Sequence, residues 1–257
     1  MLGKLLKYEL PAMGRKLVPL YVAWAVTAIF LGLTAQAAES KSEFMVVISA
    51  LLYTAVATAI FVMTILLIVQ RYNNSLLGDE AYFNHVLPVS VSAHIGNKAI
   101  SATIWVIVTI LVAVFTGILI GIGALIVSGE ALSLKDLIQA LYGINLPQHF
   151  GLYVIEILIG VVVSIVKTIM QIYVAVTVGH QAANHTTLAS IGAYILILII
   201  ESSVGRLLFP IFALTPDLNE SVSFHLLFGI GIVMGLVFST AYFFVCKYLM
   251  EKRLNLA

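Results

Sequence analysis

The sequence predicts an all-α membrane protein, with six transmembrane helices forming a single transmembrane domain over residues 1–257. Of these residues, 61% are hydrophobic and only 10% are charged, whereas soluble domains carry about 25% charged residues. Six apolar runs are long enough to cross a bilayer, which takes about 20 residues in a helix. The runs are continuous rather than alternating, so they are not strands of a membrane barrel. This composition excludes a disordered chain and a disulfide scaffold.

The six predicted spans cover residues 17–36, 45–69, 99–127, 151–178, 187–212 and 223–246. Several exceed 25 residues, which indicates tilt or projection beyond the bilayer rather than further spans. The net charge is +1, so no nucleic-acid partner is expected. The single cysteine, Cys246, lies in the last run and cannot form an intrachain disulfide.

Residues 1–16 are predicted to form an interfacial helix before the first span. Apolar residues recur there at helical spacing while the basic residues lie mostly elsewhere, a pattern typical of a helix lying on a membrane surface. Pro11 is expected to bend it. One alternative is a frayed basic leader. Another is a signal peptide cleaved after the small residues near Ala35 and Ala37.

The distribution of Lys and Arg places both termini in the cytoplasm. Nine of these residues lie on the side of the termini and two, Lys41 and Lys135, on the other side. Because cytoplasmic loops carry the excess of basic residues, we expect a multi-pass protein of the plasma membrane with both ends inside.

The cytoplasmic segment 70–98 is predicted to contain a short helix of its own. Gly78 ends the preceding helix, and Pro88 ends a new helix over about 79–87. Acidic residues at its start and an apolar, aromatic face mark this helix: Asp79, Glu80, Tyr82, Phe83, Val86 and Leu87. The face either packs on the chain's own helix ends and the lipid headgroups or binds a cytoplasmic partner.

Two stretches resemble a known family. The opening Leu-Leu-Lys-Tyr-Glu-Leu before a basic pair, and the phrase Gly-Asp-Glu-Ala-Tyr…Leu-Pro-Val-Ser between spans two and three, are similar to the permease subunits of type-2 ABC exporters. The six-span layout with both ends inside is similar as well. In that family the loop carries a coupling helix, which inserts into the ATP-hydrolysing subunit. The resemblance implies that Asp79, Glu80, Tyr82, Leu87 and Pro88 belong to such a helix.

The resemblance also implies the partners of the chain. An ATP-binding cassette subunit would bind the coupling helix, and a second permease copy or a paralogue would complete the pathway through the lipid bilayer. The sequence has no G-x-x-x-x-G-K-[ST] loop, so we expect no cofactor and no catalysis in this chain. ATP and Mg would be held by the partner subunit.

Four charged residues fall within the predicted spans: Glu156, Lys167, Glu201 and Arg206. Each costs about 2.5–3.5 kcal/mol at the centre of a membrane helix, so each needs water or a partner. At 1.5 Å per residue, Lys167 comes within about a turn of the level of Glu201, and Glu156 comes level with Arg206. Two ion pairs between spans four and five are therefore possible. They would be either structural or part of a substrate path or proton relay.

Further polar and glycine patterns bear on packing. Ser164 and Gln171 lie near the face of span four that carries Glu156 and Lys167, which predicts one polar stripe on that helix. The motifs Gly117-x-x-x-Gly121 and Gly231-x-x-x-Gly235 permit close helix approach. Residues 128–150 fit a short external amphipathic helix. The six histidines show no metal-ligand spacing and H-E-x-x-H is absent, so no metal site is expected.

The expected function is that of a permease subunit of an ATP-driven exporter, with a peptide, an antibiotic or an amphipathic, lipid-like molecule as substrate. The alternative is a secondary transporter that couples to an ion through the intramembrane charges. An intramembrane enzyme is a third hypothesis, which predicts turnover by the isolated chain.

Overall fold

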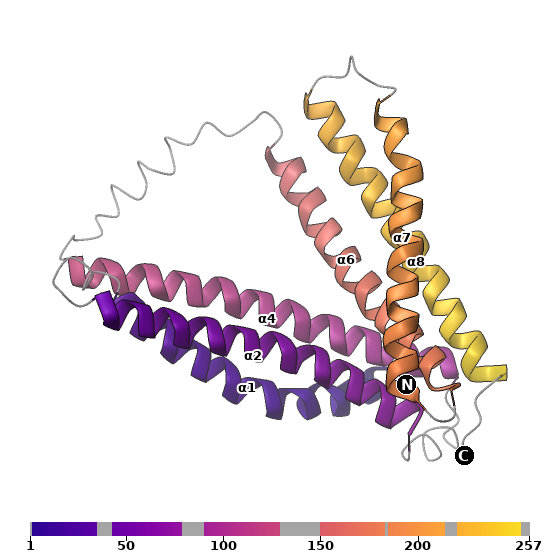
Figure 1. Cartoon of the computed structure of the whole chain (residues 1–257), viewed down its shortest axis with the longest axis horizontal. Coiled ribbons are helices and arrows are strands. Elements are labelled where there is room, and N and C mark those ends of the chain that lie inside the picture. Colours follow the sequence, from indigo (N-terminus) through magenta and orange to yellow (C-terminus); the bar gives the residue numbers. More distant parts are fainter. Residues whose placement is uncertain are drawn as a thin grey trace. The chain divides into compact units, whose positions relative to one another are not determined.

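The computed structural model describes residues 2–34, 43–78, 90–128, 150–182, 185–213 and 220–252. Their regular structure is entirely α-helical (Figure 1). The six helices are α1 (Leu2–Thr34), α2 (Glu43–Leu76), α4 (Val91–Ser128), α6 (Phe150–Gly179), α7 (Thr186–Ala213) and α8 (Glu220–Lys252). All six are long and apolar enough to cross a membrane, so the six predicted spans are confirmed and the chain has the fold of a multi-pass membrane protein.

The surface of these helices suits lipid rather than water. Large hydrophobic side chains are exposed on every helix, among them Phe61 on α2, Leu111 on α4, Leu158 on α6 and Phe244 on α8. Monomeric soluble proteins rarely expose apolar patches larger than a few hundred Å². In a bilayer these side chains would face lipid hydrocarbon instead of water, so their exposure would carry no hydrophobic cost.

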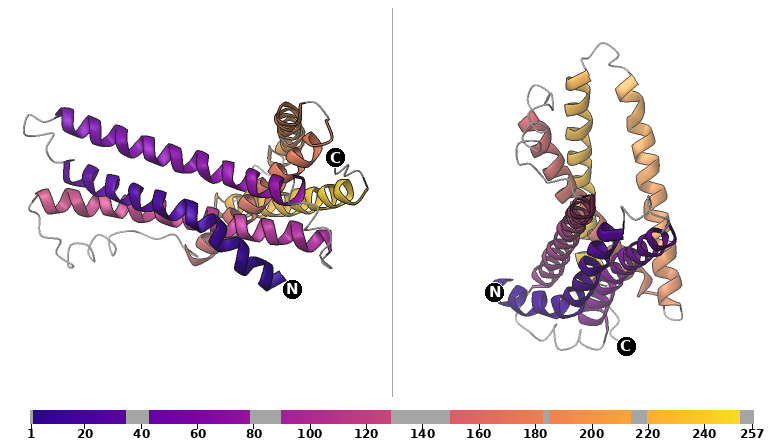
Figure 2. Two further views of the ribbon diagram at one scale, coloured as in Figure 1. Left: turned by 90° about the horizontal axis from the view of Figure 1, so that it is seen from below. Right: turned by 90° about the vertical axis from the view of Figure 1, so that its left-hand side faces the viewer.

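The N-terminal segment differs from the prediction. The expected interfacial helix 1–16 and the first span are parts of one continuous helix, α1, which contains Pro11 and Pro19. Figure 2 shows its axis changing direction in the N-terminal third, where Pro11 has no N–H to donate to the preceding turn. The indole Nε1–H of Trp105 donates to the neighbouring carbonyl of Leu10 at 3.2 Å. This bond fastens the bend of α1 to α4, and membrane helices tolerate proline where the freed backbone groups find other partners.

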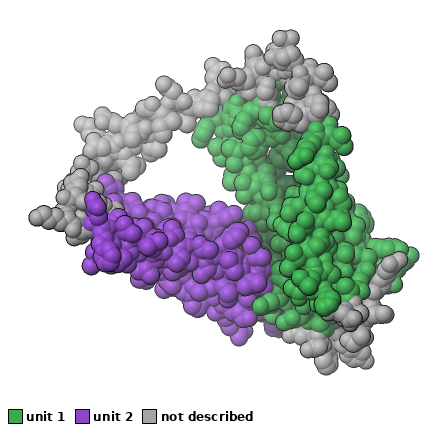
Figure 3. Space-filling model, in the orientation of Figure 1, with its two compact units in different colours: residues 1–6, 68–103, 149–257 green, residues 7–67, 104–148 purple. Residues whose placement is uncertain are grey.

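The chain divides into two compact units, coloured separately in Figure 3. One unit comprises residues 7–67 and 104–148, and the other comprises residues 1–6, 68–103 and 149–257. The first therefore holds most of α1 and α2 with the C-terminal part of α4. The second holds α6, α7 and α8 with the remaining ends of α2 and α4.

In the unit of α1, α2 and α4, backbone contact at glycine brings α1 and α4 together. A Cβ added to Gly32 would lie 2.7 Å from the carbonyl oxygen of Ile120, and one added to Gly123 would lie 2.9 Å from Cα of Gly32. Hydroxyl pairs support the packing: Tyr21 with Thr109 at 2.6 Å between α1 and α4, Thr34 with Ser49 at 2.7 Å between α1 and α2, and Tyr53 with Thr116 at 3.1 Å between α2 and α4.

The predicted glycine motif of span three, Gly117 and Gly121, does not form the close contact between α1 and α4. A Cβ on Gly117 or Gly121 would meet no atom within 4 Å, because these positions face away from the described neighbours. Gly123, two residues after Gly121, is rotated by about 200° around the helix and faces α1 instead. The close-approach residue therefore lies outside the motif.

In the unit of α6, α7 and α8, helix α6 packs against both of the others. A Cβ on Gly235 of α8 would lie 2.6 Å from Cγ1 of Val163, so this glycine of the second predicted motif does permit close approach. At the other end of α6, the ring of Tyr173 stacks on Tyr72 with centroids 3.9 Å apart. The Tyr72 hydroxyl lies 2.8 Å from Oγ1 of Thr177, which fixes the end of α2 against α6.

Two predicted segments lie outside the described residues. One is most of the segment 128–150, and the other is the coupling helix with Asp79, Glu80, Tyr82, Phe83, Leu87 and Pro88. Helix α2 ends next to the predicted break at Gly78, whereas α4 begins eight residues before the predicted start of span three at residue 99. The last turn of α2 closes where the N–H groups of Leu77 and Gly78 both donate to the carbonyl of Asn73, at 2.9 and 2.8 Å. Helix α4 then begins at Val91, directly after Ser90.

Candidate functional site

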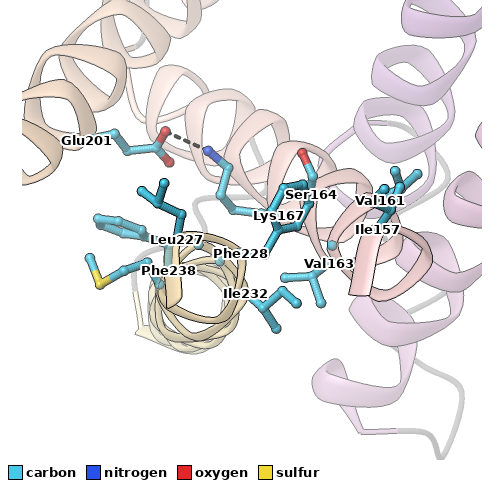
Figure 4. A pocket seen from close by; sticks show the side chains of 14 residues that line it. Ile157, Val161, Val163, Ser164, Lys167, Glu201, Leu227, Phe228, Ile232 and Phe238 are labelled. Carbon is cyan, nitrogen blue, oxygen red and sulfur yellow. Dashed lines mark hydrogen bonds and ion pairs between the residues drawn. The ribbon is translucent and has the colours of Figure 1, made fainter. Parts of the chain in front are cut away.

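Three helices meet at Glu201. The ammonium of Lys167 on α6 donates to Oε2 of this α7 carboxylate at 2.7 Å, and the hydroxyl of Tyr242 on α8 donates to Oε1 at 2.7 Å. Figure 4 shows the Lys167 side chain extended toward Glu201. The first of the two ion pairs that the sequence allowed is therefore formed. We call Lys167, Glu201 and Tyr242 the Glu201 network.

The geometry of the Glu201 network explains how two charges persist within membrane helices. The exposed fraction of the side chain is 24% for Lys167 and 13% for Glu201, so each is largely withdrawn from its surroundings. A carboxylate is an acceptor only, and an ammonium is a donor only. Each carboxylate oxygen receives one donor here, and the two charges cancel. Pairing of this kind is what makes buried charges tolerable.

A groove of about 620 Å³ lies beside the network, lined by α6 and α8 with Glu201 from α7 (Figure 4). Most of its lining is apolar, including Ile157, Val161, Leu227, Phe228, Ile232 and Phe238. We call it the α6–α8 groove. Its volume is within the range of about 300–1,000 Å³ that is typical of small-molecule sites.

Glycines on α8 shape this groove. Gly235 brings α8 close to α6, as its contact with Val163 shows. Gly231, one turn away, also lines the groove, but a Cβ there would meet no atom within 4 Å. Gly160 on α6 faces Phe228, whose ring lies 3.7 Å from an added Cβ. The helices therefore touch at one glycine and leave open space at another.

The predicted polar stripe on α6 is divided among different surroundings. Ser164 lines the groove together with Lys167. Gln171 is 2% exposed, and its Nε2 has no hydrogen-bond partner among the described residues. Glu156 lies at the other end of α6, outside the groove lining. Only the middle of the stripe therefore belongs to the candidate site.

The second possible ion pair, Glu156 with Arg206, is not formed. Glu156 contacts His225 of α8, with 2.7 Å between Oε2 and Nδ1, and the ring of Tyr153 stacks on His225 with centroids 4.6 Å apart. Arg206 is exposed on α7. Five residues separate Arg206 from Glu201, which is about 140° around a helix. Since Glu201 faces α6, Arg206 is directed away from it, although its depth matches that of Glu156.

The chain matches no family model, no curated protein and no solved structure. Among the described residues, no group of three or more His, Cys, Asp or Glu side chains could hold a metal ion. The functional argument therefore depends on the helical layout, the α6–α8 groove and the Glu201 network.

Proposed function

We propose that the chain is the transmembrane permease subunit of an ATP-driven ABC exporter, which moves a peptide, an antibiotic or an amphipathic, lipid-like substrate out of the cell. The observation that carries the proposal is the segment between α2 and α4. It follows the end of α2 at Leu76 and has the Asp-Glu-Ala-Tyr…Leu-Pro-Val-Ser phrase that resembles the coupling helix of type-2 exporters.

The division of labour follows from this resemblance. An ATP-binding cassette subunit holds ATP and Mg and binds the segment 79–88 on the cytoplasmic side. A second copy of the chain, or a paralogue, supplies the other half of the pathway. Both termini are cytoplasmic in the plasma membrane, and the first turns of α1 lie at the membrane surface. ATP binding would move the coupling segment and, through α2 and α4, the helices attached to it.

The α6–α8 groove supports a hydrophobic or amphipathic cargo. It combines apolar walls with one polar end, at Lys167 and Glu201. Small-molecule sites commonly consist of an apolar cleft with a few polar groups that fix orientation.

Co-purification tests the proposal. The chain, extracted in mild detergent, should retain the ATP-binding cassette protein encoded nearest its gene. Leu87→Arg introduces a charge on the apolar face of the proposed coupling helix and should abolish retention while membrane insertion stays normal. Leu137→Arg, in the segment 128–150 on the predicted external side, is the matched control and should retain the partner. Equal retention by both variants would contradict the assignment of the coupling helix.

An ion-coupled secondary transporter is the second candidate function, favoured by one observation. The Glu201 network joins three helices through a carboxylate, an ammonium and a hydroxyl, groups that exchange protons in membrane relays. This candidate predicts uptake driven by an ion gradient in vesicles that contain the chain alone. Absence of gradient-driven uptake, together with ATP-dependent transport in the presence of the partner, would decide for the exporter.

A further inference from the structure

We propose that the α6–α8 groove binds an uncharged amphiphile, with a single hydrocarbon chain along its apolar walls and an oxygen-rich polar end at Lys167. As a statement about cargo, this rests on the proposed export function. As a binding site, it rests only on the groove and the Glu201 network. Ester, amide and hydroxyl compounds with one acyl chain belong to this class.

The length and apolar lining of the groove indicate the hydrocarbon part of the ligand. Groove-lining positions run from Ile157 to Lys167 on α6 and from Leu227 to Phe238 on α8. At 1.5 Å per residue, both stretches are about 15 Å long. A groove of this length between two helices can hold an extended hydrocarbon chain along its axis. The open space at Gly231 deepens the groove at its middle, where a side chain would otherwise occupy the path.

The hydrogen-bonding groups determine the polar end. Ser164, Lys167 and Glu201 are the polar side chains that line the groove. Both carboxylate oxygens of Glu201 already receive a donor. An ammonium has three N–H donors, and one of those on Lys167 is directed to Glu201. The groove therefore offers donors from Lys167 and the Ser164 hydroxyl, which acceptor oxygens of a ligand would satisfy.

The charge balance excludes an ionised polar end. Lys167 and Glu201 neutralise each other at 2.7 Å, so a carboxylate, phosphate or ammonium on the ligand would bring an uncompensated charge into the membrane interior. Such a charge is strongly disfavoured there unless it is paired. A hydroxyl, ester or amide end uses the same donors without that cost.

The direction of the groove fits loading from the cytoplasmic leaflet. In the proposed orientation α6 runs from outside to inside, so Ile157 lies toward the outer surface and Lys167 toward the inner one. A lipid of the inner leaflet points its polar end the same way. An amphiphile could therefore move sideways from the inner leaflet into the groove without turning over.

Photolabelling tests this site directly. The full chain, in nanodiscs of phosphatidylcholine, is illuminated with a monoacylglycerol that carries a diazirine in its acyl chain, and labelled peptides are identified by mass spectrometry. We expect labelling on the groove faces of α6 and α8 that excess unlabelled monoacylglycerol removes. Labelling spread evenly over lipid-facing helices, or resistant to competition, would mean only bulk lipid contact and would overturn the proposal.

Matched variants test the walls. Gly231→Leu fills the groove and should lower the competable labelling about tenfold, because the added side chain occupies the path of the hydrocarbon chain. Gly229→Leu adds the same side chain two residues away, at a position that does not line the groove and where an added Cβ meets no atom within 4 Å. This variant should be labelled like the wild type. Val161→Phe is a second groove-filling change, made from the α6 side. Unchanged labelling in a folded Gly231→Leu or Val161→Phe chain would refute the site.

Matched probes test the polar end. A fatty acid with the same diazirine chain should label the groove about tenfold less than the monoacylglycerol, because its carboxylate adds an uncompensated charge. An alkane with that chain should also label about tenfold less, because it offers no acceptor oxygen to Lys167 or Ser164. The double variant Lys167→Met with Glu201→Gln should lose this preference while alkane labelling stays unchanged. Fatty acid labelling equal to that of the monoacylglycerol would refute the uncharged head. Since no ATP-binding partner is present, failure here leaves the permease proposal intact, and failure of that proposal leaves this site intact.

Discussion

The hydroxyl of Tyr242 donates to the carboxylate oxygen of Glu201 that Lys167 leaves free, at 2.7 Å. This bond connects α8 to α7, while the ion pair connects α7 to α6. One carboxylate thus holds three membrane helices at a single level. Glu201 also lines the polar end of the α6–α8 groove, so the group that joins the three helices borders the candidate site.

Substitution within the ion pair should be non-additive. Lys167→Met leaves Glu201 with one hydrogen-bond donor and no counter-charge, and Glu201→Gln leaves an unpaired ammonium. Each single change should lower the unfolding free energy by about 1.5–3 kcal/mol. The double change removes both charges and should cost less than the sum of the singles. Thermal unfolding of the purified chain in detergent measures this, and strictly additive losses would show that the two side chains do not interact.

Tyr242→Phe should destabilise the bundle through a single hydrogen bond. It removes the donor to Glu201 while keeping the ring, and the expected loss is about 1.5–3 kcal/mol because the acceptor is charged. Tyr248→Phe is the control: it is the same change on the same helix, at a side chain that is 52% exposed and has no hydrogen bond among the described residues. Equal thermal stability of the two variants would argue against the bond.

Gly32→Ala should weaken the contact of α1 with α4. An added Cβ would lie 2.7 Å from a backbone oxygen of α4, so the helices must separate. Gly117→Ala and Gly121→Ala place the same methyl in open space and should be neutral or stabilising, because alanine is favoured over glycine in a helix by about 1 kcal/mol. Thermal unfolding compares the three variants. A loss at Gly117 or Gly121 as large as at Gly32 would contradict the packing described here.

His225→Leu should destabilise the chain, and Arg206→Gln should not. The first change leaves the Glu156 carboxylate without the ring nitrogen that lies 2.7 Å away. The second alters an exposed side chain on α7. A double-mutant cycle of His225→Leu with Glu156→Gln should give a coupling energy of at least about 0.5 kcal/mol. A cycle of Arg206→Gln with Glu156→Gln should give none, and the reverse pattern would restore the pairing expected from the sequence.

The spans could be predicted from the sequence because a bilayer imposes a length and a polarity on any helix that crosses it. The end of α2 could be predicted as well, since glycine disfavours a helix and Gly78 lies two residues beyond its last residue. The continuity of α1 could not, because proline ends most helices in water but is tolerated within membrane helices. The bond from Trp105 to α1 could not be predicted either, since Trp105 lies on a helix far along the chain.

Depth along a helix predicted the pairing of Lys167 with Glu201, because rise per residue is fixed. Depth alone did not give the partner of Glu156. It does not say on which side of α7 Arg206 lies, and Arg206 is turned away from α6 because Glu201 faces α6. The position of His225 at the start of the last apolar run offered a signal, because it places His225 at the same end of its helix bundle as Glu156. Tyr242 offered none, because a tyrosine in an apolar run is ordinary and its partner depends on how three helices pack.

The measurement that tests the central claim most directly is ATP hydrolysis by the chain reconstituted in nanodiscs with the ATP-binding cassette protein encoded nearest its gene. The account predicts a stable complex that hydrolyses ATP, whose rate responds to the monoacylglycerol in wild type and in Gly229→Leu. In Gly231→Leu the response should be lost while basal hydrolysis persists, and in Leu87→Arg the complex itself should fail to form. A folded chain that binds no such protein, with or without a change at Leu87, would contradict the account.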